Sequence, residues 1–102
     1  MNHEICHRLP DDRILKEGDC IGIDIGLKYK GYCGDACVTF PVGHVSPATE
    51  RMLTIGREAL AWGIAAVKPG GYLGDIGQAI HAYADSKGVS VVREWGRAWH
   101  RP

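Results

Sequence analysis

The stretch CIGIDIGLKYKGYCGDACVTF, residues 20–40, has the alternating pattern of a β-hairpin. In its first half, apolar side chains occupy every second position, and glycines and one aspartate stand between them. A period of two is typical of a strand with two different faces. We therefore predict a strand over residues 21–28, a turn at 29–31 and a return strand over 32–42.

Each predicted strand carries one aspartate, Asp24 in the first and Asp35 in the second. In a hairpin centred between Tyr29 and Lys30, facing residues have numbers that sum to 59, and 24 plus 35 is 59. We therefore expect the two side chains to stand directly opposite each other on one face, with Cβ atoms roughly 4.5–5.5 Å apart. This pattern alone leaves two interpretations open, a polar face that meets water and a pair of ligands for a cation.

Two helices are expected after the hairpin. Ser46 is a suitable N-cap because Pro47 can occupy the first helical position. Apolar and small residues then recur at spacings of three and four, which predicts one buried stripe. The residues of this stripe are Met52, Leu53, Gly56, Ala59, Leu60, Gly63, Ile64 and Val67. The segment KPGG at 68–71 ends this helix, since proline and paired glycines do not continue one.

The second helix is predicted between Asp75, as its cap, and Gly88, as its end. Its inward residues are expected to be Ile76, Ala79, Ile80 and Tyr83. The segment VSVVRE at 89–94 predicts a short strand. This order of elements indicates an α+β fold, an antiparallel hairpin and a short strand with two helices on one face.

Composition excludes several classes of function. The 102 residues include twelve basic and twelve acidic ones, so no net charge attracts the chain to nucleic acid or to an anionic membrane. No apolar run approaches the length of about 20 residues that a membrane helix needs. The first residues lack the apolar segment of a signal peptide, so we expect a cytoplasmic location with reduced thiols. A zinc site at Cys33 and Cys37 is an alternative, less favoured than two half-buried side chains.

Longer segments carry a family resemblance. CHRLPDDRILKEGDCIGIDIGLKYKGYCGDACVTFPVG and VKPGGYLGDIGQAIHAYADSKGVSVVRE resemble the type I methionine aminopeptidases, in unbroken order over residues 2–94. The most specific pieces are CH with PDD, the ID and GD pair, and VVRE. The resemblance implies one partial aminopeptidase domain over residues 1–102, roughly half of the pita-bread fold of these enzymes.

The resemblance also implies a site and an activity. Asp24 and Asp35 match the first two of five ligands that hold two divalent ions, and His7 matches a histidine that contacts the substrate. The expected reaction is metal-dependent hydrolysis that removes the N-terminal methionine from peptides, with cobalt, manganese, iron or zinc as the metal. The remaining histidines match no motif and are expected at the surface; they are His3, His44, His81 and His100.

Several positions depart from the family pattern. Arg8 replaces a glycine beside His7, and GDAC replaces the usual GDTS, so that Ala36 and Cys37 stand where the family has hydroxyls. Residues 95–102 diverge completely, although the family continues after VVRE with the motif G-H-G-I-G that supplies the third ligand. Codons for Gly96 to Arg101 can be chosen so that a one-base shift restores this motif. We therefore expect a frameshifted and truncated gene, with an unrelated tail or a cloning scar as the alternative.

Two functions follow. In the first, the chain is part of a methionine aminopeptidase that carries two of five ligands, weakly binds metal at most, and is inactive alone. In the second, it is a non-catalytic half-fold that acts as a binding module, or a pseudogene product. Under both, apolar surface and an unpaired sheet edge are left uncovered, so we expect the chain to form a homo-oligomer.

Overall fold

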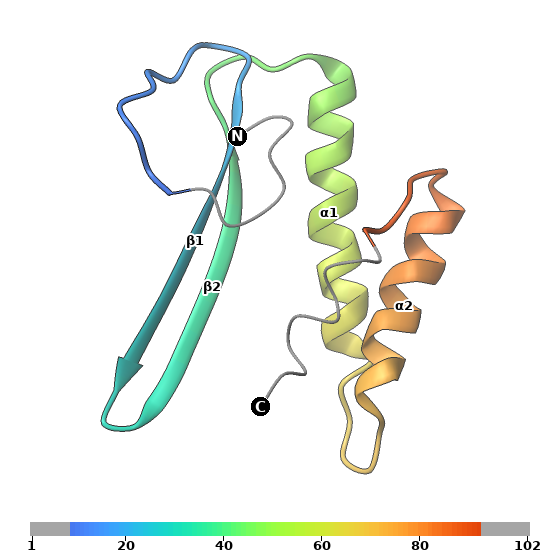
Figure 1. Ribbon diagram of the computed structural model, residues 1–102. Helices are drawn as coiled ribbons and strands as arrows, with labels where there is room; N and C mark the ends of the chain where they lie inside the picture. The colour runs from blue at the N-terminus through green and yellow to red at the C-terminus, as the bar shows by residue number, and fades with distance from the viewer. Residues whose placement is uncertain (1–8, 93–102) are drawn as a thin grey trace. The chain divides into compact units, whose positions relative to one another are not determined.

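The computed structural model of the protein describes residues 9–92 (Figure 1). The chain divides into two units, residues 1–53 and 54–102, and each is considered by itself. His7, the predicted substrate contact, and the divergent tail 95–102 lie outside the described residues.

The first unit is built on a long antiparallel hairpin. Strand β1 runs over Cys20–Tyr29 and strand β2 over Tyr32–Pro41, and the turn between them has two residues, Lys30 and Gly31. Both turn residues have positive φ, 49° and 82°, as a type I′ turn requires. The turn therefore pairs Tyr29 with Tyr32 and centres the hairpin between Lys30 and Gly31. This centre lies one residue beyond the predicted one.

The two faces of the hairpin differ as the alternation predicts. One face is apolar, and its larger side chains remain substantially exposed; they include Ile23, Ile25, Leu27, Val38 and Phe40. The opposite face carries Asp24 and Asp35 together with glycines and cysteines. We call this second surface the acid face. It comprises Gly22, Asp24, Gly26, Lys28, Cys33, Asp35, Cys37 and Thr39.

The connector before β1 is tied to the end of β2 by backbone and carboxylate bonds. The Gly18 amide donates to the Val42 carbonyl at 2.9 Å, and the Val42 amide donates to the Asp19 carbonyl at 2.8 Å. The Glu17 carboxylate accepts from the His44 amide at 3.3 Å. These bonds hold the open end of the hairpin, so the register is fixed at both ends.

The predicted N-cap of the first helix is confirmed, whereas the second helix begins earlier than predicted, with Tyr72 as its N-cap and Asp75 at its third position. Helix α1 spans Pro47–Ala65, and the Ser46 hydroxyl accepts from the Thr49 amide at 3.2 Å. Helix α2 spans Leu73–Ser86, and the Asp75 carboxylate in its first turn accepts from the Tyr72 amide at 2.9 Å.

Helix α2 ends in a Schellman motif. Gly88 adopts a φ of 72°, its amide donates to the Asp85 carbonyl, and the Val89 amide donates to the Ala84 carbonyl. Residues 89–92 form neither helix nor strand. The prediction of a strand over 89–94 is therefore wrong for residues 89–92. The sheet of the described residues contains β1 and β2 alone, and the Val89 amide bonds back to the end of α2.

The second unit is held by contacts between α1 and α2, which lie side by side in Figure 1. Ile55 and Ala84 are its buried apolar residues, with 6% and 4% of their surface exposed. Gly63 is buried as well, and a Cβ there would lie 2.9 Å from the Cδ1 of Ile80. Trp62 stacks on Tyr83 with ring centroids 6.3 Å apart.

The predicted single buried stripe of α1 is wrong. Leu60, Ile64 and Val67 expose 58%, 64% and 63% of their surface. At 3.6 residues per turn, Leu60 and Ile64 lie roughly 140–180° around the helix from the buried Ile55, and Val67 lies beyond the end of α1 at Ala65. Helix α1 thus has two apolar sides. Residues on both sides recur at spacings of three and four, so the sequence pattern did not distinguish one side from the other. Neither helix in residues 9–92 is long and apolar enough to span a bilayer.

Candidate metal site

The two aspartates share the acid face of the hairpin, on a diagonal. Asp24 pairs with Cys37, and Asp35 pairs with Gly26. The shared face is as predicted, whereas the prediction that the acids stand directly opposite is wrong. The cause is the two-residue turn, which moves the pairing of β2 by two positions and so preserves the face while changing the partner.

The diagonal separation suits ligands that share a cation. Diagonal neighbours on one face of an antiparallel pair lie about 7–8 Å apart, with Cβ atoms somewhat closer. Each carboxylate extends beyond its Cβ, and oxygen ligands lie about 2.0–2.2 Å from small divalent ions. Asp24 and Asp35 can therefore both reach an ion placed between them.

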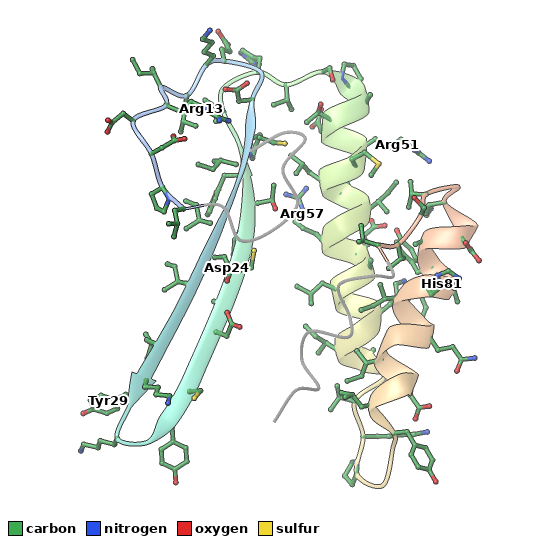
Figure 2. The ribbon with its side chains drawn as sticks, viewed as in Figure 1. Arg13, Asp24, Tyr29, Arg51, Arg57 and His81 are labelled. Atoms are coloured by element: carbon green, nitrogen blue, oxygen red, sulfur yellow. The ribbon has the colours of Figure 1, made fainter. Side chains whose placement is uncertain are left out.

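The surroundings of the two acids leave room for such an ion. A Cβ added at Gly26 would meet no atom within 4 Å, and one at Gly22 would meet only the Thr39 hydroxyl at 3.7 Å. Figure 2 shows Asp24 midway along β1. Within residues 9–92, no hydrogen bond or ion pair to the carboxylate of Asp24 or Asp35 is formed. Their oxygens thus have capacity for a metal.

The donor chemistry fits a divalent ion, but the described ligand set is partial. Carboxylate oxygens are hard donors that suit magnesium or manganese and also occur in zinc and cobalt sites. The described part of the chain holds no group of three or more His, Cys, Asp or Glu side chains that could bind a metal. Two carboxylates therefore leave most of a coordination shell to water or to other residues.

The alternative zinc site at Cys33 and Cys37 does not fit the strand. The two cysteines lie four positions apart on one face of β2, which separates them by roughly 13 Å. A zinc–sulfur bond is about 2.3 Å long, so one ion cannot reach both thiolates.

Neither histidine of the described chain is a residue of the acid face. His44 is exposed beside the end of β2, and His81 lies on α2 with its Nε2 3.5 Å from the Asp85 carboxylate (Figure 2). His3 and His100 lie outside the described residues. Lys28 and Thr39 also belong to the acid face, because the alternation that places Asp24 and Asp35 there continues by one more step on each strand.

A hydrogen bond joins the two helices. The Tyr83 hydroxyl donates a hydrogen bond to the Glu58 carboxylate. This bond raises the pKa of Tyr83 above its ordinary value, with smaller contributions from desolvation and from the negative charge of Glu58. The Lys87 ammonium lies 5.7 Å from the centre of the Tyr83 ring. The cluster links α1 to α2 and contains no metal-ligand pair.

The chain is similar to known metallopeptidases. Residues 1–98 match the family described as Metallopeptidase family M24. The chain is 46% identical over 95 residues to methionine aminopeptidase B of Synechocystis, covering 92% of this chain and 35% of the relative. It is 43% identical over 95 residues to methionine aminopeptidase 1 of Bacillus subtilis, covering 93% of this chain and 38% of the relative.

A solved structure is similar as well. The crystal structure of methionine aminopeptidase from Rickettsia prowazekii superposes with a TM-score of 0.82 at 40% identity, over 87% of this chain and 36% of that chain. The predicted α+β fold, a part of the pita-bread architecture, is thereby confirmed. The chain spans between about a third and two-fifths of the length of these three relatives.

Proposed function

Because the chain belongs to metallopeptidase family M24, we propose that it supplies the ligands Asp24 and Asp35 to the metal centre of a methionine aminopeptidase. The observation that carries the proposal is the placement of both carboxylates on one open face of a single hairpin, within reach of a shared ion. The two units are parts of one aminopeptidase domain in this proposal. The substrate is a peptide that begins with methionine, and His7 contacts it.

The proposed metal is divalent, and carboxylate ligands do not by themselves choose among cobalt, manganese, iron and zinc. If such ions were held by Asp24 and Asp35, they would supply Lewis acidity for activating a water and for polarising the scissile carbonyl. The contribution of this chain is to hold the ions: Asp24 and Asp35 offer negative oxygens from two neighbouring strands, fixed by the backbone ladder between them. Gly22 and Gly26 keep the space beside them open.

We further propose that the 102-residue chain is inactive by itself. Two carboxylates do not fix the geometry of two ions, and the described residues offer no third ligand beside them. The competing proposal is a non-catalytic half-fold that acts as a binding module. The two differ in whether Asp24 and Asp35 are needed for methionine release when the remaining part of an aminopeptidase is present.

A chimera tests this need. The chain replaces the 95 matched residues of the Bacillus subtilis enzyme, and release of methionine from a Met-Ala-Ser peptide is measured with manganese or cobalt. We expect the chimera to be active and Asp24→Asn or Asp35→Asn to lower kcat/KM by more than about 100-fold, beyond the loss typical of residues that only support a ligand. Asp85→Asn, on the exposed surface of α2, is the matched control and should change the rate little.

Two results would contradict the proposal. If the chimera stays active with Asp24→Asn, Asp24 is not a ligand of the catalytic metal. Turnover by the 102-residue chain alone, lost on Asp24→Ala, would show that the chain is an enzyme in its own right.

We also propose that the isolated chain forms a homo-oligomer. The apolar face of β1 and β2 exposes large side chains, among them Ile25 at 57% and Val38 at 53%. Contiguous apolar surface of this kind commonly marks an interface, and both edges of a two-stranded sheet have backbone groups available for pairing. A twofold dimer that uses the same surface on both copies is the simplest arrangement.

A further inference from the structure

Cys37 lies beside Asp24 and Asp35 on the acid face. Four residues form a square on the two strands: Asp24 opposite Cys37, and Gly26 opposite Asp35. The two acids lie on one diagonal of the square, and Cys37 and Gly26 lie on the other. An ion shared by the acids would therefore sit between Cys37 and Gly26.

The two remaining corners of this square differ in the space that they leave. Gly26 has no side chain, and a Cβ there would meet no atom within 4 Å. Cys37 is exposed and is the cross-strand partner of Asp24, so its Cβ lies roughly 4.5–5.5 Å from that of Asp24. It also lies two positions from Asp35 on the same strand, roughly 6.6 Å away. Cys37 is thus the one side chain of the square besides the two acids.

We propose that Cys37 controls the occupancy of the Asp24–Asp35 site: an ion binds while this side chain is an unmodified thiol, and a thiol-reactive electrophile closes the site. This inference rests on the proposed function, because it takes the two aspartates as metal ligands. It adds a regulatory residue and a class of reagent that acts on it. A thiol is small enough to stand beside the ion, whereas an adduct on its sulfur extends over the diagonal between the carboxylates.

The modifying step is an ordinary alkylation. With iodoacetamide, the sulfur of Cys37 forms a bond to the methylene carbon while the carbon–iodine bond breaks, and iodide and the thiol proton leave. The product carries an acetamide group at the corner that faces Asp24. A bound ion should in turn hinder the approach of the reagent, so occupancy and alkylation oppose each other.

Cys33 provides a matched control on the same strand and face. It is exposed, as Cys37 is, and it pairs with Lys28 near the turn. Cys33 lies outside the square, roughly 6.6 Å from Asp35 on the side away from Asp24 and roughly 13 Å from Cys37, so an acetamide group there does not stand between the two carboxylates. Alkylation of Cys33 should therefore leave the two carboxylates accessible.

The experiment compares two versions of the full chain, each with one cysteine. One retains Cys37, the other retains Cys33, and the remaining cysteines are replaced by serine. Binding of Mn²⁺ is measured by electron paramagnetic resonance before and after alkylation, and the alkylation rate is measured with and without Mn²⁺. We expect alkylated Cys37 to weaken Mn²⁺ binding at least about tenfold, as disturbance beside a metal ligand commonly does, and Mn²⁺ to slow alkylation of Cys37 but not of Cys33.

The results distinguish failure of the Cys37 inference from failure of the metal-ligand proposal on which it rests. If both unmodified versions bind Mn²⁺ in a manner that Asp24→Asn abolishes, and alkylated Cys37 binds it equally well, the inference is wrong and the proposed ligands stand. If neither version shows Mn²⁺ binding that depends on Asp24, the ligand assignment and the inference both fail. Cys37→Leu places a bulky group at the same corner without a reagent and should reproduce the loss seen on alkylation.

Discussion

The Tyr83 side chain connects α1 and α2, and its pKa depends on that contact. Its hydroxyl donates to the Glu58 carboxylate across the helix pair, and its ring stacks on Trp62. The hydrogen bond raises the pKa of Tyr83 because ionisation would place two negative charges together after the shared proton is lost. The folded-state pKa thus lies above the ordinary value of about 10 for the unfolded chain.

The sign of the pH dependence follows from this shift. The native state holds the Tyr83 proton more tightly, so the stabilisation is fully present below the unfolded pKa and is lost as the pH rises through the folded one. We expect Glu58→Gln to lower the pKa of Tyr83, seen in the ultraviolet absorbance of the phenolate, and Tyr83→Phe to remove this alkaline loss. Tyr72→Phe, at an 81% exposed residue, is the control. An unchanged titration in Glu58→Gln would contradict the role of this bond.

Among elements, the turn of the hairpin determines where Asp24 and Asp35 lie relative to each other. A side chain at Gly31 would be strained at a φ of 82°, so Gly31→Ala should lower the free energy of unfolding by about 1–2 kcal/mol. Gly34→Ala, in β2, adds a Cβ at an ordinary contact distance of 3.7 Å from Leu27 and should not destabilise the chain. Chemical denaturation followed by circular dichroism compares the two. Equal effects would show that the turn does not depend on the positive φ.

The same elements show what the sequence could and could not predict. Alternation is a local property of each strand, so it correctly predicted the shared face of the acids. The register depends on which two residues adopt positive φ, and a lysine at the first turn position gave no signal for it. In α1, both apolar sides have spacings of three and four, so only the contact with α2 separates the buried Ile55 from the exposed Leu60 and Ile64. The pairing partner of a strand is likewise non-local, which explains the wrong expectation at residues 89–92.

At the scale of the whole molecule, we expect the isolated chain to associate through its apolar sheet face. Light scattering should give a mass that rises above that of one chain as concentration increases. Ile25→Lys places a charge on this face and should shift the chain toward the monomer, whereas Thr39→Lys, on the acid face, should not. A monomer mass at high concentration would contradict the proposal, and an equal effect of both substitutions would show that a different surface is used.

The central proposal is that Asp24 and Asp35 share a metal ion. Two ligands of one ion do not act independently, so their substitutions should couple in a double-mutant cycle. Sharing an ion also requires that both carboxylates remain on the acid face, as the register has them.

The most direct measurement is a calorimetric titration of Mn²⁺ into the chain and into Asp24→Asn, Asp35→Asn and the double variant. We predict that either substitution weakens binding at least about tenfold and that the second adds little to the first, because one ligand alone no longer holds the ion. Binding by Asp24→Asn that equals the parent would contradict the account, as would fully additive losses, which would place the two aspartates at separate ions.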